Sequence, residues 1–172
     1  YEIYQCDWSS DVCSSDLTTA SNLTAVGYNA LYNNTTGTYN TGVGTQALLN
    51  TTTGAGNTSV GYQSAYTNTT GIYNTAVGYQ SLFTNSIGTK NTAVGHYALY
   101  TSTGDGLTSI GQASLYSNTT GTSNTAVGYQ AGYYNQTGSY NAILGWNAAG
   151  TGGAGVASNR KSTRLNSSHT DI

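Results

Sequence analysis

Residues able to perform acid–base, nucleophilic or metal chemistry are scarce in the central part of this 172-residue chain. Between residues 18 and 158, Lys90 and Asp105 are the only charged side chains and His96 is the only histidine. Paired carboxylates for acid–base catalysis are therefore impossible there. A serine nucleophile would have to take its base and its orienting acid from His96 and Asp105 alone. We predict that this segment is not an enzyme.

The repeat pattern described below suggests simpler roles for these three side chains. His96 stands where other repeats have tyrosine, which favours a stacking ring over a general base. Asp105 lies between two glycines and is typical of a turn rather than a metal ligand, and Lys90 occupies a solvated turn position. Zinc lacks ligands here, and the glycine-rich run 150–155 lacks the lysine of a phosphate-binding loop. We expect neither a metal nor a cofactor.

The composition excludes further classes of protein. Only 6% of residues are charged and none is proline, whereas about a quarter are charged in an average soluble domain. The net charge of −2, without a basic run in the centre, argues against a nucleic-acid partner. The sequence has no run of 18 apolar residues, so we expect neither a membrane-spanning helix nor direct membrane insertion by this segment. Many Asn, Thr, Ser, Tyr and Gly residues instead favour a regular β-structure.

The two ends of the chain resemble a translated sequencing adapter. Residues 8–16 can be encoded by an oligonucleotide whose reverse complement, in a shifted frame, encodes residues 160–167. Protein segments related in this way have no folding explanation. We therefore expect 1–17 and 159–172 to be non-native, with both cysteines belonging to the first segment rather than to a functional disulfide. Residues 18–158 form the predicted repeat domain, a fragment of a longer array.

A repeat of 17 residues dominates the central part. An aliphatic residue followed by glycine recurs from Val26 to Leu144 at spacings of 17, 17, 17, 17, 16, 17 and 17 residues. We number each repeat from the residue two before the aliphatic one, so Thr75 is position 1 of the fourth repeat. Position 7 is Ala or Ser throughout, and position 9 is mostly aromatic. The short spacing falls beside Gly104 and predicts a residue missing from a turn.

Seventeen residues are too few for a pair of helices, so each repeat is predicted to form one coil of β-structure. Thr-Ala-Val forms the first strand, glycine closes it at a corner, and the following Ala/Ser-Leu-Tyr segment forms the second strand. The predicted fold is all-β, a parallel β-solenoid or β-roll of about eight 17-residue coils. Its core is expected to contain Val, part of position 7 and Leu. A meander of hairpins is the alternative, with strands of alternating direction.

Position 9 is expected to place an aromatic stripe along the outside of the solenoid, because its rings cannot all fit in so narrow a coil. An exposed apolar stripe is unusual for a monomer, and a low charge density suits an interface between chains. We expect this position to pack against sister chains. Its aromatic residues are Tyr32, Tyr66, Phe83, Tyr100, Tyr116 and Tyr133.

The run Asn-Thr-Ala-Val-Gly-Tyr-Gln, at residues 74–80 and 124–130, resembles the head repeats of trimeric autotransporter adhesins. In that family a small-aliphatic-glycine strand lies in each coil of a left-handed parallel β-roll, and three rolls pack together. The array is also similar to those of tail-fibre-like proteins. The resemblance covers most of residues 21–150. It implies a homotrimeric rod at a cell surface or outside the cell, anchored in an outer membrane through other regions, or alternatively on a virion tail fibre.

A structural and adhesive rod is therefore the predicted function, with host surface, matrix protein or glycan bound through many weak contacts. The candidate contacts are the tyrosines that follow the corner glycine, because tyrosine offers rigid amphipathic area. The alternative for each of these rings is that it only stacks on its neighbours. They are Tyr28, Tyr62, Tyr79 and Tyr129.

Three other functions stay open. The threonines at position 1 form a regular file, which is typical of an ice-binding solenoid. Against this, the strand itself lacks a paired Thr-x-Thr file, and if Val lies inside the coil then Thr lies inside with it. A tail-fibre stalk would bind nothing itself. A glycan-degrading fibre enzyme would need catalytic acids from flanking regions.

Overall fold

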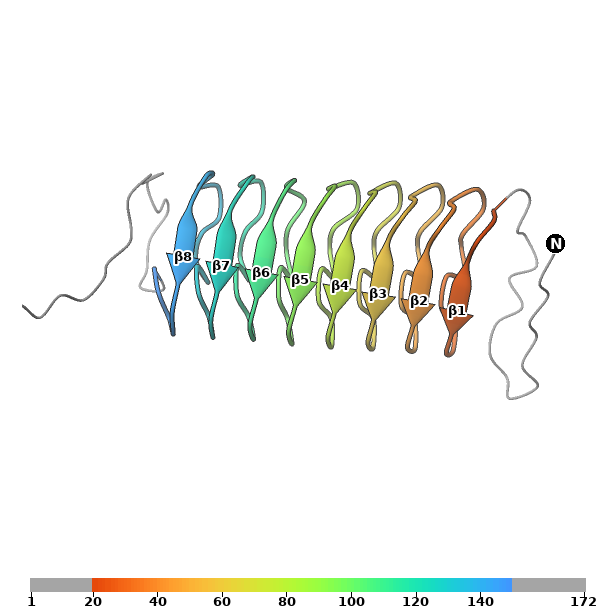
Figure 1. The fold of residues 1–172 in the computed structure, drawn as a ribbon, viewed down its shortest axis with the longest axis horizontal. Coiled ribbons are helices and arrows are strands. Elements are labelled where there is room, and N and C mark those ends of the chain that lie inside the picture. The colour runs from red at the N-terminus through yellow and green to blue at the C-terminus, as the bar shows by residue number, and fades with distance from the viewer. Residues whose placement is uncertain (1–19, 150–172) are drawn as a thin grey trace, which may run out of the picture.

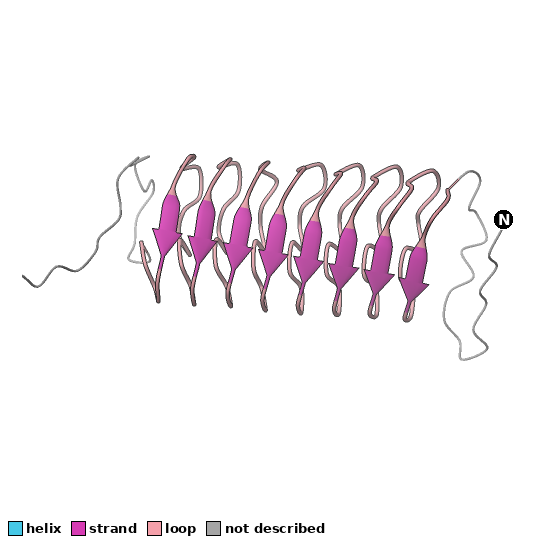
Figure 2. Cartoon of the chain, viewed as in Figure 1, coloured by secondary structure: helices cyan, strands magenta, loops and turns pink. Residues whose placement is uncertain are grey.

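The structure, a computed structural model, describes residues 20–149, so both adapter-like segments and the run 150–155 lie outside it. The described part contains eight three-residue β-strands and no helix (Figures 1 and 2). Each strand occupies positions 1–3 of its repeat. The strands are β1 (Thr24–Val26), β2 (Thr41–Val43), β3 (Thr58–Val60), β4 (Thr75–Val77), β5 (Thr92–Val94), β6 (Thr108–Ile110), β7 (Thr125–Val127) and β8 (Ala142–Leu144).

All eight strands form one parallel sheet in sequence order, lying side by side along the rod (Figure 1). Each residue pairs with the residue at the same repeat position in the next coil, as Thr75 does with Thr92. The same register holds across the short repeat, where Thr92 pairs with Thr108. These findings confirm the predicted parallel solenoid and the absorption of the missing residue in a turn. They exclude the hairpin meander, because its strands would be antiparallel.

The predicted second strand, Ala/Ser-Leu-Tyr, is wrong. Positions 6 and 8 adopt left-handed backbone conformations, with φ of 48° at Gln80 and 53° at Leu82, and a strand requires negative φ. The backbone therefore turns sharply on both sides of position 7. Coil-to-coil hydrogen bonds nevertheless continue here, since Leu82 N donates to Ala98 O at 2.9 Å. Stacking provides the backbone with partners even where no strand forms.

The strands face the core with their middle residue, so the predicted burial of Val is wrong. Ala76 and Ala93 are completely or almost completely buried, whereas Val60 is 37% and Ile110 41% exposed. Thr and Val do lie on one face of the strand and Ala on the other, as the alternation of side chains along a strand predicts. That alternation left open which face points inward. The interior explains the choice: a Cβ placed on Gly42 would lie 3.3 Å from Leu31 Cγ. A small residue therefore fits opposite the leucine of position 8. The larger Ile143 occurs at position 2 only in β8, where position 8 is Gly132 in the preceding coil and Ala149 in its own.

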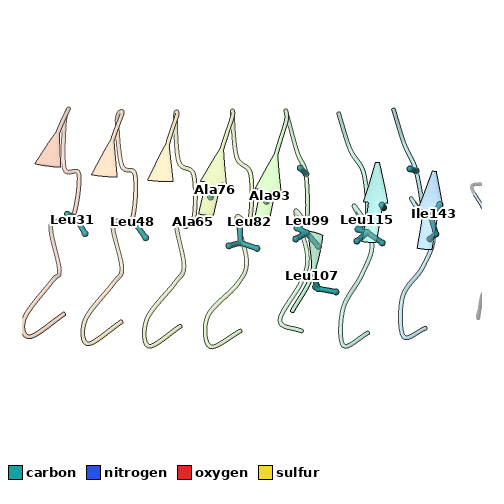
Figure 3. Close-up of a cluster of buried hydrophobic side chains, with 13 residues drawn as sticks. Leu31, Leu48, Ala65, Ala76, Leu82, Ala93, Leu99, Leu107, Leu115 and Ile143 are labelled. Carbon is teal, nitrogen blue, oxygen red and sulfur yellow. The ribbon is translucent and has the colours of Figure 1, made fainter. Parts of the chain in front are cut away.

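Leucines at position 8 and small residues at positions 2 and 7 form most of the apolar part of the core, which also includes Leu107 and Ile143 (Figure 3). This confirms the predicted burial of leucine and of position 7. The leucines line up from coil to coil, so a narrow apolar column runs along the rod. The fully or almost fully buried leucines at this position are Leu31, Leu48, Leu82, Leu99 and Leu115.

Asparagines fill the polar part of the interior. At position 17, the buried Asn74 donates from Nδ2 to Gly88 O at 2.8 Å, and its Oδ1 accepts from the backbone N–H of Asn91 at 3.0 Å. At position 11, Asn85 Nδ2 donates to the same Gly88 carbonyl at 3.0 Å. Buried amides thus satisfy backbone groups that no strand reaches.

The corner after each strand requires glycine. Gly61 has φ of 135°, a conformation that side chains rarely adopt, and a Cβ there would lie 2.5 Å from Gly78 O in the next coil. Both the backbone conformation and the close coil spacing therefore exclude a side chain. By contrast, Gly106 has φ of 65°, and a Cβ on this residue would meet no atom closer than Ser123 Oγ at 3.7 Å.

We predict that Gly61→Ala lowers the free energy of unfolding by about 2 kcal/mol or more, because strain and a backbone clash add. Gly106→Ala is the control and is expected to cost about 1 kcal/mol, since only the left-handed conformation opposes it. Urea unfolding followed by circular dichroism measures both. Equal losses in the two variants would contradict the proposed stacking constraint.

Candidate binding surfaces

The corner tyrosines at position 5 (Tyr28, Tyr62, Tyr79 and Tyr129) all lie at the surface, with exposed fractions between 40% and 51%. Their placement follows from the glycine turn, which directs the next side chain away from the core. Tyr62 and Tyr79 stack with ring centroids 5.2 Å apart and an angle of 15° between planes. The rings are thus accessible, and neighbouring rings also stack along the rod.

The aromatic file at position 9 forms a nearly continuous stack. From Tyr66 through Phe83, Tyr100 and Tyr116 to Tyr133, successive centroids lie 4.9–5.2 Å apart with planes within 10° of parallel. These five rings are half-buried, whereas Tyr32 in the first coil is 49% exposed. Ring faces inside the stack cover one another, so the stack presents mainly its edges to a partner.

Tyr97, which the repeat columns did not single out, joins the two sets of rings. Its ring lies edge-to-face with Tyr79 at 5.6 Å and with Tyr100 at 5.2 Å. Positions 5 and 9 are therefore parts of one surface, which we call the aromatic face. The available signal was the departure of Tyr97 from its column, where Gln63, Gln80 and Gln130 stand in other repeats.

Polar groups also run along the aromatic face. His96 lies 5.2 Å from the ring of Tyr79 and 4.0 Å from Tyr97, within the ring contacts as its column suggested. At position 6, Gln80 Nε2 donates to Gln63 Oε1 at 2.6 Å, and Gln63 Nε2 donates to Gln46 Oε1 at 2.7 Å. The surface is thus neutral and hydrogen-bonding as well as aromatic.

A second surface, the strand face, consists of the outward side chains of positions 1 and 3. It carries a file of threonines and a file of Val, Ile or Leu, all partly or largely exposed. From Thr41 to Thr125, the hydroxyls at position 1 make no hydrogen bond to another residue of the described part. An inward Val would have placed this file of threonines in the interior, whereas the structure places both files outward.

Asp105 makes hydrogen bonds between turns. Asp105 Oδ1 accepts hydrogen bonds from Thr89 N at 2.6 Å and from Thr89 Oγ1 at 3.2 Å, and so connects two successive turns. Residues 20–149 contain no cluster of three His, Cys, Asp or Glu side chains suited to a metal. Over the same residues, no helix is long and apolar enough to cross a membrane.

Comparison of the chain with protein-family models, with curated proteins and with solved structures finds no match.

Stacking changes the acidity of one ring in the aromatic file. Burial raises the pKa of Tyr116 above 10.0, and charge interactions with Tyr133, Tyr100 and Tyr97 raise it further. The folded chain therefore keeps this phenol protonated at a pH where the unfolded chain ionises it. Because the native state then binds more protons, stability falls as the pH rises above 10.0.

We predict that Tyr116→Phe loses less stability than the parent chain when the pH is raised from neutrality to above 10.0. Phe83 already occupies this column, so the substitution preserves the stack. Tyr73→Phe is the control, because the Tyr73 ring is 62% exposed. Melting temperatures measured at both pH values test this, and an identical fall in all three proteins would contradict it.

Proposed function

We propose that the chain is a segment of a structural and adhesive rod that binds through repeated weak contacts along its aromatic face. The observation that carries this proposal is the continuity of that face, in which Tyr97 connects rings of positions 5 and 9. Repetition multiplies one modest contact by the number of coils and by the number of displayed copies.

The backbone supports a rigid rod. Hydrogen bonds between successive coils occur in the strand, at the corner and beyond it, as for Gly78 N to Val60 O at 2.8 Å and Thr84 N to Tyr100 O at 3.0 Å. A rod fixed in this way presents its side chains in one conformation. Binding then costs little ordering entropy, which favours weak contacts acting together.

The chemistry of the aromatic face fits a neutral partner, such as a matrix protein or an uncharged glycan. Tyrosine hydroxyls and glutamine amides both donate and accept hydrogen bonds, and Lys90 and Asp105 are the only charged residues among 20–149. Tyrosine is also the residue that binding loops use for rigid amphipathic contact. Display at a cell surface or on a virion tail fibre would bring such a face to its partner.

Association of three copies is the second part of the proposal. The edges of the position 9 stack form a long stripe that lacks charged side chains, and partner chains would remove it from water. The corner tyrosines lie beside this stripe, with Tyr97 in contact with both. They would then form the rim of the inter-chain contact, where side chains stay accessible to a ligand.

We expect the chain to be a trimer in solution and Tyr100→Lys to dissociate it, because a charge would be buried in the interface. The matched control is Tyr73→Lys, since Lys90 stands at the same position of the next coil with the same φ of 58°. Light scattering after size-exclusion chromatography gives the mass. A monomeric parent chain, or equal masses for both variants, would contradict the trimer.

We further expect the Tyr62→Gln, Tyr79→Gln double variant to lose most binding of chain-coated beads to an array of neutral glycans or to collagen. Gln112 already occupies this column, so the fold tolerates the change. Tyr73→Gln serves as the control, with binding expected to stay at the parent level. Absence of parent binding to every probe, or equal binding by all three proteins, would overturn the adhesive role.

A further inference from the structure

The proposed adhesive role assigns no ligand to the strand face. We propose that this face is an ice-binding surface, which takes the ordered water of an ice crystal as its ligand. An inward Val would bring Thr inside with it and would remove the threonine file from this face. The structure places both outward, with Ala, Ser, Gly or Ile of position 2 facing the core.

The strand face is a two-dimensional lattice. Along the rod, parallel pairing in strict register repeats each Thr and each Val at about 4.8 Å. Along each strand, positions 1 and 3 lie about 6.7 Å apart, twice the rise per residue. A crystalline ligand requires regular spacing in both directions, and the rigid stacking of coils provides it.

The hydroxyls of this lattice have capacity left for water. From Thr41 to Thr125 they form no hydrogen bond within the described part of the chain, and each can donate once and accept twice. Threonines elsewhere in the coil differ, since Thr67 and Thr84 donate from Oγ1 to backbone carbonyls of the next coil. The position 1 file is thus a row of hydroxyls directed at solvent.

The Val file complements the hydroxyls rather than interrupting them. Val77 has the shape of threonine with a methyl group in place of the hydroxyl, so its strand carries one polar and one apolar anchor. Water beside methyl groups loses orientational freedom, and the neighbouring hydroxyl can fix that water in place. Together the two files would hold a layer of water ordered enough to join a growing crystal.

A protein partner fits this face less well than ice does. Protein interfaces depend on a few large anchors, chiefly Trp, Tyr and Arg, that fill pockets. The strand face has none at positions 1 and 3 and carries no charge there. Its flat repetition of small side chains suits a flat repeating ligand, whereas the aromatic face holds the residues typical of protein contacts.

The test uses the 172-residue chain and three variants in an ice-recrystallisation assay, together with adsorption of fluorescently labelled protein to a single ice crystal. We expect the parent chain to slow recrystallisation and to adsorb to ice. Thr75→Lys should lose most of both activities, because a long charged side chain separates the face from the crystal. Tyr73→Lys, which changes an exposed side chain outside positions 1 and 3, should keep them.

A Thr58→Val, Thr75→Val, Thr92→Val variant isolates the hydroxyls, because Val keeps the β-branched shape and the strand preference. We expect it to fold as the parent does and to adsorb to ice more weakly. No effect of the parent chain on ice, or equal activity of all variants, would overturn the proposal. So would a change of oligomeric mass in Thr75→Lys alone, which would identify the strand face as a contact between chains.

Discussion

Each coil of this rod satisfies its backbone polar groups mainly through the coils above and below it. A strand of three residues supplies few of these hydrogen bonds, so the corner and the turn must be stacked as well, as the bond from Leu82 N to Ala98 O illustrates. That requirement holds successive coils at one spacing and in one register. Glycine corners, buried asparagines and aligned surface files all follow from it.

The interior meets this requirement with side-chain amides as well as with backbone pairs. Asn74 connects three successive coils, because its side chain accepts and donates toward the next coil and its own N–H donates to Asn57 Oδ1 at 2.9 Å. The short fifth repeat is the exception, since Leu107 replaces asparagine at position 17. Its backbone N–H still donates to Asn91 Oδ1 at 2.9 Å, and its side chain joins the apolar core instead.

The period of the sequence predicted the parallel stack, the strand at positions 1–3, the corner glycine and the turn that absorbs the missing residue. It could not predict which strand face points inward, because alternation alone is symmetric. That choice depends on the leucine of position 8, which lies so close to position 2 that a small side chain fits there in the coils that have this leucine. The prediction of a second strand was wrong for a related reason. Gln80 and Leu82 have left-handed φ values, and neither is a glycine, the residue type that would have indicated such a conformation in the sequence. Tyr97 was overlooked because column averages conceal single residues that depart from their column.

The aromatic face and the strand face differ in how many contacts their side chains make within the chain. Rings of the aromatic file cover one another, so much of their stacking capacity is used within the chain and a partner meets edges, hydroxyls and the amides of position 6. The hydroxyls of the strand-face threonines make no hydrogen bond within residues 20–149. Stacking therefore stabilises the rod through one surface and leaves the other directed at water. Because both lattices have the same coil spacing, adding coils would extend each surface in proportion, and contacts too weak singly would become strong over the length of the rod.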